Sequence, residues 1–318
     1  MSAFRSLTVT CTLASALLGT GAAHAQSFPT KAIRMVTATP GGGADFSARA
    51  LAQKMAVIVG RPVVVDNRGI NSMQIVATAP ADGYTILTYG SPMWLAPLMH
   101  ETAWDPIKDF APVIAATDAP NMLAIHPSVP AKSVKELIAV AKAKPGQLNY
   151  ASGSPGSASH LGAELLKSMA GIDIVHVPFK GVGQALTGVL SNEAQVLLMV
   201  VSGVAPHVAA GRLRALAVTS AKPTKLAPGV PTVSESGVPG FEVGTIIGVF
   251  APAGTPALII RALNQSLRRV LESPDVQERF FATGVEVTPG PPETLAAVVK
   301  ADIARFGKVV KDAGIGRK

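Results

Sequence analysis

Residues 33–45, IRMVTATPGGGAD, contain the pattern from which the fold is predicted. The apolar run at 33–38 is typical of a strand, and the proline and three glycines at 40–43 are typical of a tight loop. The residues that follow place apolar side chains on one face of a helix, as expected for an element that covers a sheet. The side chains of that face are Phe46, Ala50, Leu51, Met55 and Ile58. The stretch therefore predicts a strand, a glycine loop and a helix in succession.

This alternation of strands and helices continues along the chain. Apolar runs predict a short buried strand at 63–65 and further strands at 84–89, 148–151, 172–177, 195–201 and 214–219. Ser133 and Glu136 form a capping box that begins one helix, and Thr255-Pro256 supplies a cap residue and a first-turn proline for another. Apolar strands that alternate with amphipathic helices indicate parallel sheets covered on both faces. About 290 residues of this pattern predict an α/β fold with one large sheet or two lobes.

The first 25 residues have the features of a cleavable signal peptide. Arg5 provides a positive start, residues 7–18 are mostly apolar, and the A-H-A sequence at 23–25 is a small-residue cleavage site. We therefore predict cleavage after Ala25 and an exported mature chain that begins at Gln26.

The composition excludes several classes of protein. The 318 residues are 48% hydrophobic and 15% charged, which is too apolar for intrinsic disorder. The single cysteine, Cys11, lies in the predicted leader, and one cysteine excludes a disulfide scaffold, a cysteine zinc site and an iron–sulfur cluster. The net charge is +8, but Lys and Arg are scattered and aromatics make up 5%, so we expect no nucleic-acid binding. The apolar run at 196–201 is predicted to be a buried strand rather than a membrane span.

Three glycine- or serine-rich loops follow predicted strands, at 40–45, 152–159 and 180–184. Ligands of open α/β sheets bind at the carboxyl ends of strands, so three such loops fit a site shared between lobes. In the first loop, glycines let the backbone approach a ligand closely, and N–H groups at a helix start suit an anion. The alternative is a plain tight turn in which Asp45 is the N-cap, and the spacing of a Walker A or dinucleotide motif is absent.

The second loop has four serines ahead of a helix, and their hydroxyls suit a carboxylate. The alternative is a serine-capped loop without a ligand. His160 and Glu164 share a helix face, but no second histidine stands at ligand spacing, so we expect a packed or capping histidine and no metal. Lys180 either faces an anion or lies in solvent. Because no nucleophile–base pair or G-x-S-x-G motif is found, these residues indicate an exported, two-lobed binder of a small anion rather than an enzyme.

Several motifs, in their order along the mature chain, resemble one family. The most distinctive are HVPFKG at 176–181, LAVT at 216–219 and APAGTP at 251–256. The others are PGGGAD at 40–45, PADGYTIL at 80–87, KDFAPV at 108–113 and LNYAS at 148–152. Together they resemble the substrate-binding proteins of tripartite tricarboxylate transporters, also called the Bug family, over nearly the whole mature chain.

The resemblance implies a periplasmic solute-binding protein with the two-lobed type II periplasmic-binding-protein fold. Each lobe would be a mostly parallel sheet flanked by helices, and two crossovers would join the lobes. Lobe 1 would contain residues 26–122 and 246–318, and lobe 2 residues 123–245. The ligand would be a small carboxylate held between the lobes without a cofactor. A monomeric receptor would deliver it to large and small membrane permease subunits.

The ligand contacts implied by the resemblance come from both lobes, and no catalytic residue or metal ligand is among them. In lobe 1 they are Ala38, Thr39, Pro40, Gly41, Gly42, Gly43, Asp45 and Ser91. In lobe 2 they are Ser152, Ser154, Ser157, His160, Lys180, Gly181, Val200 and Val201.

The chain departs from the family pattern at four places near this site. Ala38 replaces a frequent aromatic residue, and residues 70–74 replace a glycine-rich loop. Val200 and Val201 stand where an acidic residue is common, and Ile246 where a tryptophan is common. Drift of the core is the alternative explanation for any one of them. Together they remove a ring and a negative charge, and we hypothesise an aromatic or medium-chain mono- or dicarboxylate as the ligand.

Two other functions remain open on the same scaffold. One is an orphan solute sensor that signals ligand occupancy to a membrane histidine kinase, and gene neighbourhood would separate it from transport. The other is a secreted hydrolase or isomerase, which turnover of a bound ligand would reveal.

Overall fold

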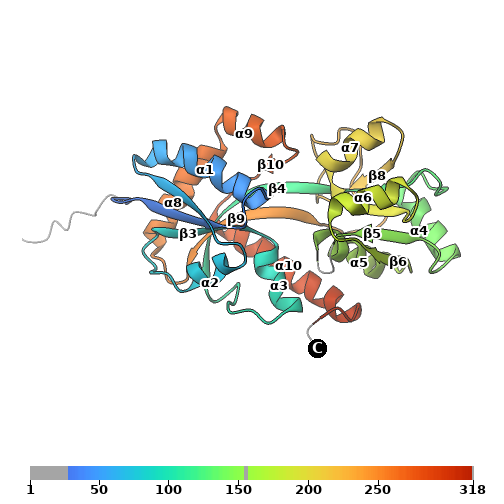
Figure 1. The fold of residues 1–318 in the computed structure, drawn as a ribbon, viewed down its shortest axis with the longest axis horizontal. Coiled ribbons are helices and arrows are strands. Elements are labelled where there is room, and N and C mark those ends of the chain that lie inside the picture. The colour runs from blue at the N-terminus through green and yellow to red at the C-terminus, as the bar shows by residue number, and fades with distance from the viewer. Residues whose placement is uncertain (1–27, 154–156, 317–318) are drawn as a thin grey trace, which may run out of the picture.

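The computed structural model describes residues 28–153 and 157–316. It consists of two lobes, each a sheet flanked by helices, connected by two long strands (Figure 1). The two-lobed α/β architecture is therefore confirmed. The predicted leader and Ser154 lie outside the described residues.

The first lobe is built from strand–helix units of the kind predicted at residues 33–45. Its first three strands pair in parallel in the order β2-β1-β3. The elements are β1 (Ile33–Thr37), α1 (Gly43–Val59), β2 (Val63–Asn67), α2 (Asn71–Ala77), β3 (Thr85–Gly90) and α3 (Pro92–Met99).

The second lobe repeats this plan with shorter strands. β5 pairs in parallel with β6 on one side and β7 on the other. Its elements are α4 (Val134–Ala143), β5 (Asn149–Ser152), α5 (Ala158–Ala170), β6 (Val175–Pro178), α6 (Val182–Leu190), β7 (Val196–Val200), α7 (Val201–Ala209) and β8 (Arg214–Val218).

Two antiparallel strands, β4 (Phe110–Ile125) and β9 (Gly244–Pro252), cross between the lobes. β9 lies between β3 and β4, whereas the end of β4 pairs with β7 and β8. The partners of β4 change between Pro120 and Asn121. These crossing strands make the sheet mixed, because a chain that passes to a second lobe and returns runs in opposite directions. The division into domains at 122/123 and 245/246 stays a prediction.

After β9 the chain completes the first lobe. The elements are α8 (Ala257–Leu271), α9 (Pro274–Phe281), β10 (Glu286–Val287) and α10 (Pro292–Asp312). α10 lies against α3 and β4, and its far end reaches α5 of the second lobe (Figure 1). Within the described residues, no helix combines the length and apolar character needed to cross a membrane.

The predicted apolar face of α1 forms part of the core of the first lobe. Leu51 and Met55 are fully buried, Ala50 is nearly so, and Phe46 and Ile58 pack at the edge of the same cluster. Burying a leucine- or methionine-sized side chain stabilises a fold by about 1.5–3 kcal/mol. This packing holds the start of α1, and the loop before it, in a defined place.

Some local predictions were wrong, each for a tertiary reason. The strand at 63–65 is not buried, because β2 is the edge strand of its sheet and Val64 remains 54% exposed. Val201 belongs to helix α7 rather than to a strand. Thr255 does not cap α8, since Pro256 is the N-cap and the Thr255 hydroxyl donates to the Pro252 carbonyl.

The predicted helix start at Ser133 is confirmed. The Ser133 Oγ accepts a hydrogen bond from the Glu136 N–H at 3.2 Å. The Glu136 carboxylate closes the cap by accepting from the Lys132 N–H at 2.7 Å, one residue earlier than in the standard capping box.

Candidate functional site

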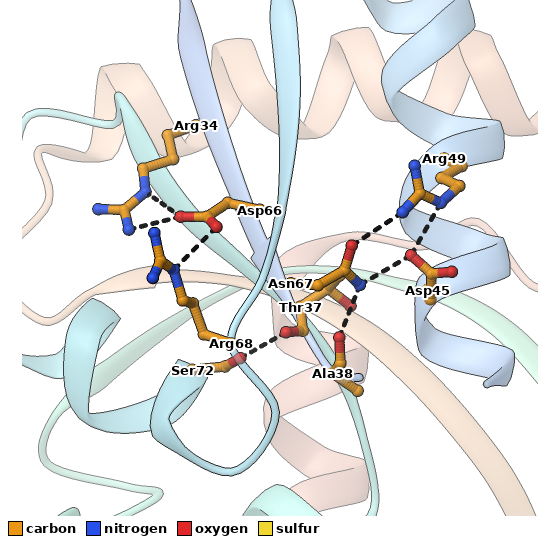
Figure 2. A network of polar contacts seen from close by, with 9 residues as sticks. All are labelled: Arg34, Thr37, Ala38, Asp45, Arg49, Asp66, Asn67, Arg68 and Ser72. Atoms are coloured by element: carbon orange, nitrogen blue, oxygen red, sulfur yellow. Dashed lines mark hydrogen bonds and ion pairs between the residues drawn. The ribbon is translucent and has the colours of Figure 1, made fainter. Parts of the chain in front are cut away.

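The buried carboxylate of Asp45 holds the loop between β1 and α1 in place through hydrogen bonds. Asp45, 5% exposed, accepts hydrogen bonds from the Gly41 N–H at 2.9 Å and from Asn67 Nδ2 at 2.8 Å. It also pairs with Arg49 Nε, one helical turn on, at 2.9 Å (Figure 2). Asp45 is therefore not the N-cap of α1, a position that Gly42 occupies. Its two oxygens bond the loop and its neighbours, which makes it a positioning residue.

Asn67 completes this anchor from the end of β2. Its Nδ2 donates to the Ala38 carbonyl at 2.7 Å as well as to Asp45, and its Oδ1 accepts from Arg49 Nη2 at 2.8 Å (Figure 2). One side chain thus joins both ends of the loop. The left-handed φ of +85° at Gly41 allows the backbone to turn its N–H toward Asp45.

The pKa of Asp45 reflects this setting. Burial pushes the pKa up, but the hydrogen bonds from Gly41, Asn67 and Arg49, together with the Arg49 charge, outweigh it and hold the pKa below its ordinary value. Asp45 is therefore ionised at neutral pH, and the Arg49 guanidinium balances its charge.

A second set of contacts supports the same strands from the other face of β2 (Figure 2). The Asp66 carboxylate accepts from Arg34 Nε and from Arg68 Nε, each at 2.8 Å. Successive residues of a strand point to opposite faces, so Asp66 bonds away from the loop that Asn67 holds. The Ser72 hydroxyl donates to the Thr37 carbonyl at 2.5 Å, which fixes the end of β1.

A cleft of about 450 Å³ opens beside the start of α1, between the two lobes. The described residues that line it come from the 41–43 loop, α1, both crossing strands, the start of α7 and the segment before β10, and none of them is charged. They are Gly41, Gly42, Gly43, Phe46, Ser47, Thr117, Ala119, Val200, Ser202, Thr245, Ile247, Thr283, Gly284 and Val285.

Two helices begin at this cleft without a side-chain cap. α1 follows Gly42, and α7 follows Val200. The first backbone bond of α1 runs from the Phe46 N–H to the Gly42 carbonyl, so the N–H groups of residues 43–45 have no acceptor within the helix. Such N–H groups and the helix dipole together favour a bound anion.

Thr117 lines the cleft and carries a buried hydroxyl. It lies on β4, it is 0% exposed, and its Oγ1 has no hydrogen-bond partner in the described part of the chain. A buried hydroxyl without a partner is unfavourable by about 1–3 kcal/mol unless a ligand or water satisfies it. Because Thr117 lines the same cleft as the start of α1, it is a candidate contact for a ligand oxygen.

The rim of the cleft brings the two lobes into contact. Gly284, in the first lobe, has φ +77°, and a Cβ built on it would overlap the side chain of Ser202 at the start of α7. Beside this contact, Thr224 Oγ1 and the Lys225 N–H both donate to the Glu286 carboxylate, at 2.8 and 3.2 Å. These contacts hold the described arrangement of the lobes on this side.

The second-lobe loop is fastened by neutral groups. The Gly153 N–H donates to Ser159 Oγ at 3.2 Å, and Ser157 Oγ caps α5 by accepting from the His160 N–H. Ser152 is fully buried, and its hydroxyl lies 3.0 Å from the Gly153 carbonyl and 2.6 Å from His176 Nε2. Gly153 packs against Val182 at the start of α6, where Gly181 is the N-cap, while Lys180 is exposed.

His160 lies in a stack of three rings below this loop. The His176 ring lies 4.8 Å from that of Tyr150 and 4.2 Å from that of His160, in both cases nearly parallel. Burial first, and then the His176 charge, lowers the pKa of His160 to about 4, so it is neutral at neutral pH. The prediction of a packed histidine is consistent with this geometry. His160 and His176 line a second cavity of about 460 Å³, together with residues at the end of α10.

The predicted ligand contacts thus fall into three groups. Gly41, Gly42, Gly43 and Val200 line the same cleft, and Ala38, Thr39 and Pro40 lie in the adjoining loop. The described residues 152–153 and 157–160, with Lys180 and Gly181, form a separate cluster that is not among the described residues lining the cleft. Ser91 and Val201 are buried. The ligand contacts themselves stay predictions.

Sequence reasoning missed several residues of the cleft. Thr117 and Thr245 lie in crossing strands, and Thr283 and Val285 come from a loop far along the chain. Gly284, a glycine just after α9, is the sequence feature that could have pointed to this segment. Of the departures from the family pattern, Val200 lines the cleft, whereas Ile246 lines a cavity of about 240 Å³ with Asp118 and Asp302.

Comparison with known proteins gives consistent matches. Residues 47–315 match the sequence model of a family described as "Tripartite tricarboxylate transporter family receptor". Protein BugT of Bordetella pertussis is 34% identical over 298 residues, which cover 91% of either chain.

Two solved structures cover most of this chain. The R. palustris protein Rpa4515, solved with adipate, is 35% identical with a TM-score of 0.72, over 91% of this chain and 99% of its own. MatC from Rhodopseudomonas palustris, solved with bound malate, is 31% identical with a TM-score of 0.68, over 89% of this chain and 100% of its own.

Proposed function

The chain belongs to the tripartite tricarboxylate transporter family of receptors, and we propose that it captures a small carboxylate between its lobes and delivers it to a membrane permease. The family consists of periplasmic solute-binding receptors, which are not enzymes. Transfer would involve the large and small permease subunits, with the receptor acting as a monomer.

One observation carries the proposal. None of the described residues that line the cleft is charged, and the lining includes both the uncapped start of α1 and Thr117, whose hydroxyl has no hydrogen-bond partner among the described residues. Free N–H groups and a hydroxyl donate hydrogen bonds to carboxylate oxygens, and the helix dipole favours their charge. An anion can therefore bind here although no lysine or arginine is among the described lining residues.

The rest of the lining favours an acid with an apolar body. Phe46, Val200, Ile247 and Val285 surround the polar groups, and among the described lining residues there is no carboxylate to hold an ammonium group. A relative holds adipate, a six-carbon chain with a carboxylate at each end, and another holds malate, which is shorter and carries a hydroxyl. We propose a medium-chain or aromatic mono- or dicarboxylate, closer to adipate than to an amino acid.

In the proposed complex, each of the two uncapped helices would bind one carboxylate group. The α1 N-terminus, with Thr117, would take one carboxylate, and the opposite start of α7 at Val200 and Ser202 would take a second one. The second-lobe residues Ser152, Gly153 and Ser157 would add contacts when the lobes close, since closure is driven by ligand contacts that both lobes share.

Calorimetric titration with a panel of acids tests this proposal. The panel contains adipate, suberate, benzoate, terephthalate, malate, aspartate and glutamate. We expect binding by one or more of the first four and none by the two amino acids. Binding of aspartate or glutamate alone would overturn the ligand class. Mass spectrometry of acid released from freshly purified, denatured protein provides an independent identification.

Delivery and export need separate tests. N-terminal sequencing of the secreted protein should give Gln26 as the first residue. Deleting the gene should lower uptake of the bound acid, and restoring it should raise uptake only when both permease subunits are present. Unchanged uptake together with a changed kinase-dependent response would assign the protein to sensing instead.

A further inference from the structure

We propose that His176 is a positioning residue that holds the end of β5 in its ligand-ready conformation through the hydroxyl of Ser152. The inference rests on the proposed function, because it assumes that Ser152 and Gly153, at the end of β5, contact the bound acid. It concerns a residue that lines the second cavity, together with residues at the end of α10.

Among the described contacts of Ser152, one arrangement of protons gives both the Gly153 carbonyl and the Ser152 hydroxyl a hydrogen bond. The Ser152 O–H donates to the Gly153 carbonyl at 3.0 Å, so its oxygen is left to accept a bond. His176 Nε2 lies 2.6 Å from that oxygen and is therefore the N–H donor. A neutral imidazole protonated at Nε2 meets this requirement.

The His176 ring is held rigidly in this orientation. His176 lies directly opposite Tyr150 in the β5–β6 register, so the two rings stand on the same face of the sheet. Tyr150 and His160, from α5, each stack against the His176 ring, with interplanar angles of 13° and 14°. The neighbouring rings have polar contacts of their own, which do not involve His176: the Tyr150 hydroxyl donates to Glu164 at 2.5 Å, and Ser157 caps the start of α5.

Ser152 connects the His176 ring to the backbone that follows β5. It is the last residue of β5, and its carbonyl accepts from the Phe179 N–H at 3.0 Å. Gly153 is bonded at both polar atoms, since its carbonyl accepts from Ser152 Oγ and its N–H donates to Ser159 Oγ. Removing the His176 donor would leave a fully buried hydroxyl oxygen without its strongest partner and free it to rotate.

The test compares four variants with matched roles. His176→Phe keeps a flat ring in the stack and removes the donor. His176→Gln restores an N–H near the position of Nε2. Ser152→Ala removes the acceptor, and Tyr150→Phe is the control, because it keeps the stack but breaks the bond to Glu164.

The first measurement needs no ligand. Amide hydrogen exchange of Gly153, followed by NMR in the ligand-free protein, should be about tenfold faster in H176F and in S152A than in the wild type, which is the scale of one lost hydrogen bond. It should be unchanged in Y150F and close to wild type in H176Q. Equal exchange in wild type and H176F, or an H176Q variant that behaves like H176F, would overturn the proposal. If H176F does not fold, S152A decides the same point.

The second measurement is adipate affinity by calorimetry. We expect H176F and S152A each to weaken binding about five- to tenfold, and the double variant to be no weaker than either one, because the two residues act as one unit. Additive losses, or a loss of the same size in Y150F, would mean that the histidine merely stabilises the fold. If the wild type does not bind adipate, that result counts against the proposed ligand class, and the exchange measurement still decides the role of His176.

Discussion

The two ligand loops are built alike but fastened by opposite chemistry. Residues 38–43 are held by an ion pair, in which Asp45 bonds Gly41 and Asn67 and Arg49 balances its charge. The described ends of the second loop, residues 152–153 and 157–159, are held by hydroxyls and a neutral imidazole. The first loop therefore tolerates a charge below an anion site only because a cation neutralises it, whereas the second adds no charge at all.

Breaking the charged anchor should give the largest effect. Asp45→Ala removes three hydrogen-bond acceptor contacts under the loop, and we expect a loss of unfolding free energy of about 2–3 kcal/mol. In this variant, adipate must order the loop when it binds. A free-energy cost of about 2 kcal/mol for this ordering would weaken adipate binding about thirtyfold. Chemical denaturation and calorimetry measure the two quantities. Asp66→Asn is the matched control, because Asp66 anchors the other face of β2, and a similar loss of affinity there would contradict the assignment.

Acidification should weaken the second-lobe loop while the anchor of the first loop stays intact. The folded protein holds the pKa of His160 at about 4, against 6.5 for the free side chain, so below pH 6.5 the unfolded chain binds a proton that the folded chain excludes. This group's contribution to stability is complete above 6.5 and is lost as the pH falls toward 4. Asp45, whose pKa is lowered, keeps the first loop anchored over the same range, and its contribution is lost only below 3.8.

Thermal unfolding between pH 4 and 7 measures this difference in wild type and His160→Phe, which keeps a ring in the stack. The variant should lose less stability on acidification. Burial, followed by the Glu242 charge, raises the pKa of Asp118 to about 6, so Asp118 adds stability as the pH falls from 6 toward 3.8. Asp118 is present in both proteins, so the difference between their curves isolates His160. Parallel curves would contradict the prediction.

A substitution at Thr117, which lines the cleft, should have a smaller effect on adipate affinity and little effect on stability. Thr117→Val replaces the unpartnered hydroxyl by a methyl group of similar shape, so stability should stay the same or rise. Adipate affinity should fall about tenfold through the loss of one hydrogen bond. Thr88→Val is the control, since Thr88 is equally buried and unpartnered but is not among the described residues that line the cleft. Equal effects of the two variants on affinity would exclude a ligand contact at Thr117.

We expect the smallest effect on adipate affinity from a substitution in the second-lobe loop, which is held by neutral groups. Ser157→Ala removes the cap of α5 and should lower the unfolding free energy by about 1 kcal/mol. Ser133→Ala removes the equivalent cap of α4, outside the site, and should lower stability equally. Only the Ser157 variant should also weaken adipate binding, by about two- to threefold. An identical affinity in both would place the second loop outside the site.

The sequence allowed many of the local units to be predicted, although the two longest strands, β4 and β9, were not among them. The strand, loop and helix at 33–59 and the cap at Ser133 depend on residues close together in the chain, and the structure has them as expected. The edge position of β2 could not be read, since three consecutive valines look the same in a central strand and at an edge.

Fewer of the residues that line the cleft could be predicted from the sequence. Its glycine loop and Val200 were expected, but Thr117 and the 283–285 segment enter through pairings between residues far apart in the chain. The function of Asp45 as an anchor depends likewise on Asn67, which reaches it from another strand.

By itself, the amino-acid sequence determined the α/β class, the glycine- and serine-rich loops at strand ends and the family, because periodicity, turn residues and motif order are local properties. Only the tertiary structure decided which groups face the cleft, that Asp45 is occupied by its own loop, and that His176 holds Ser152. The physical reason is that hydrogen bonds and burial depend on distances between strands, and those distances are set by the packing of the whole sheet.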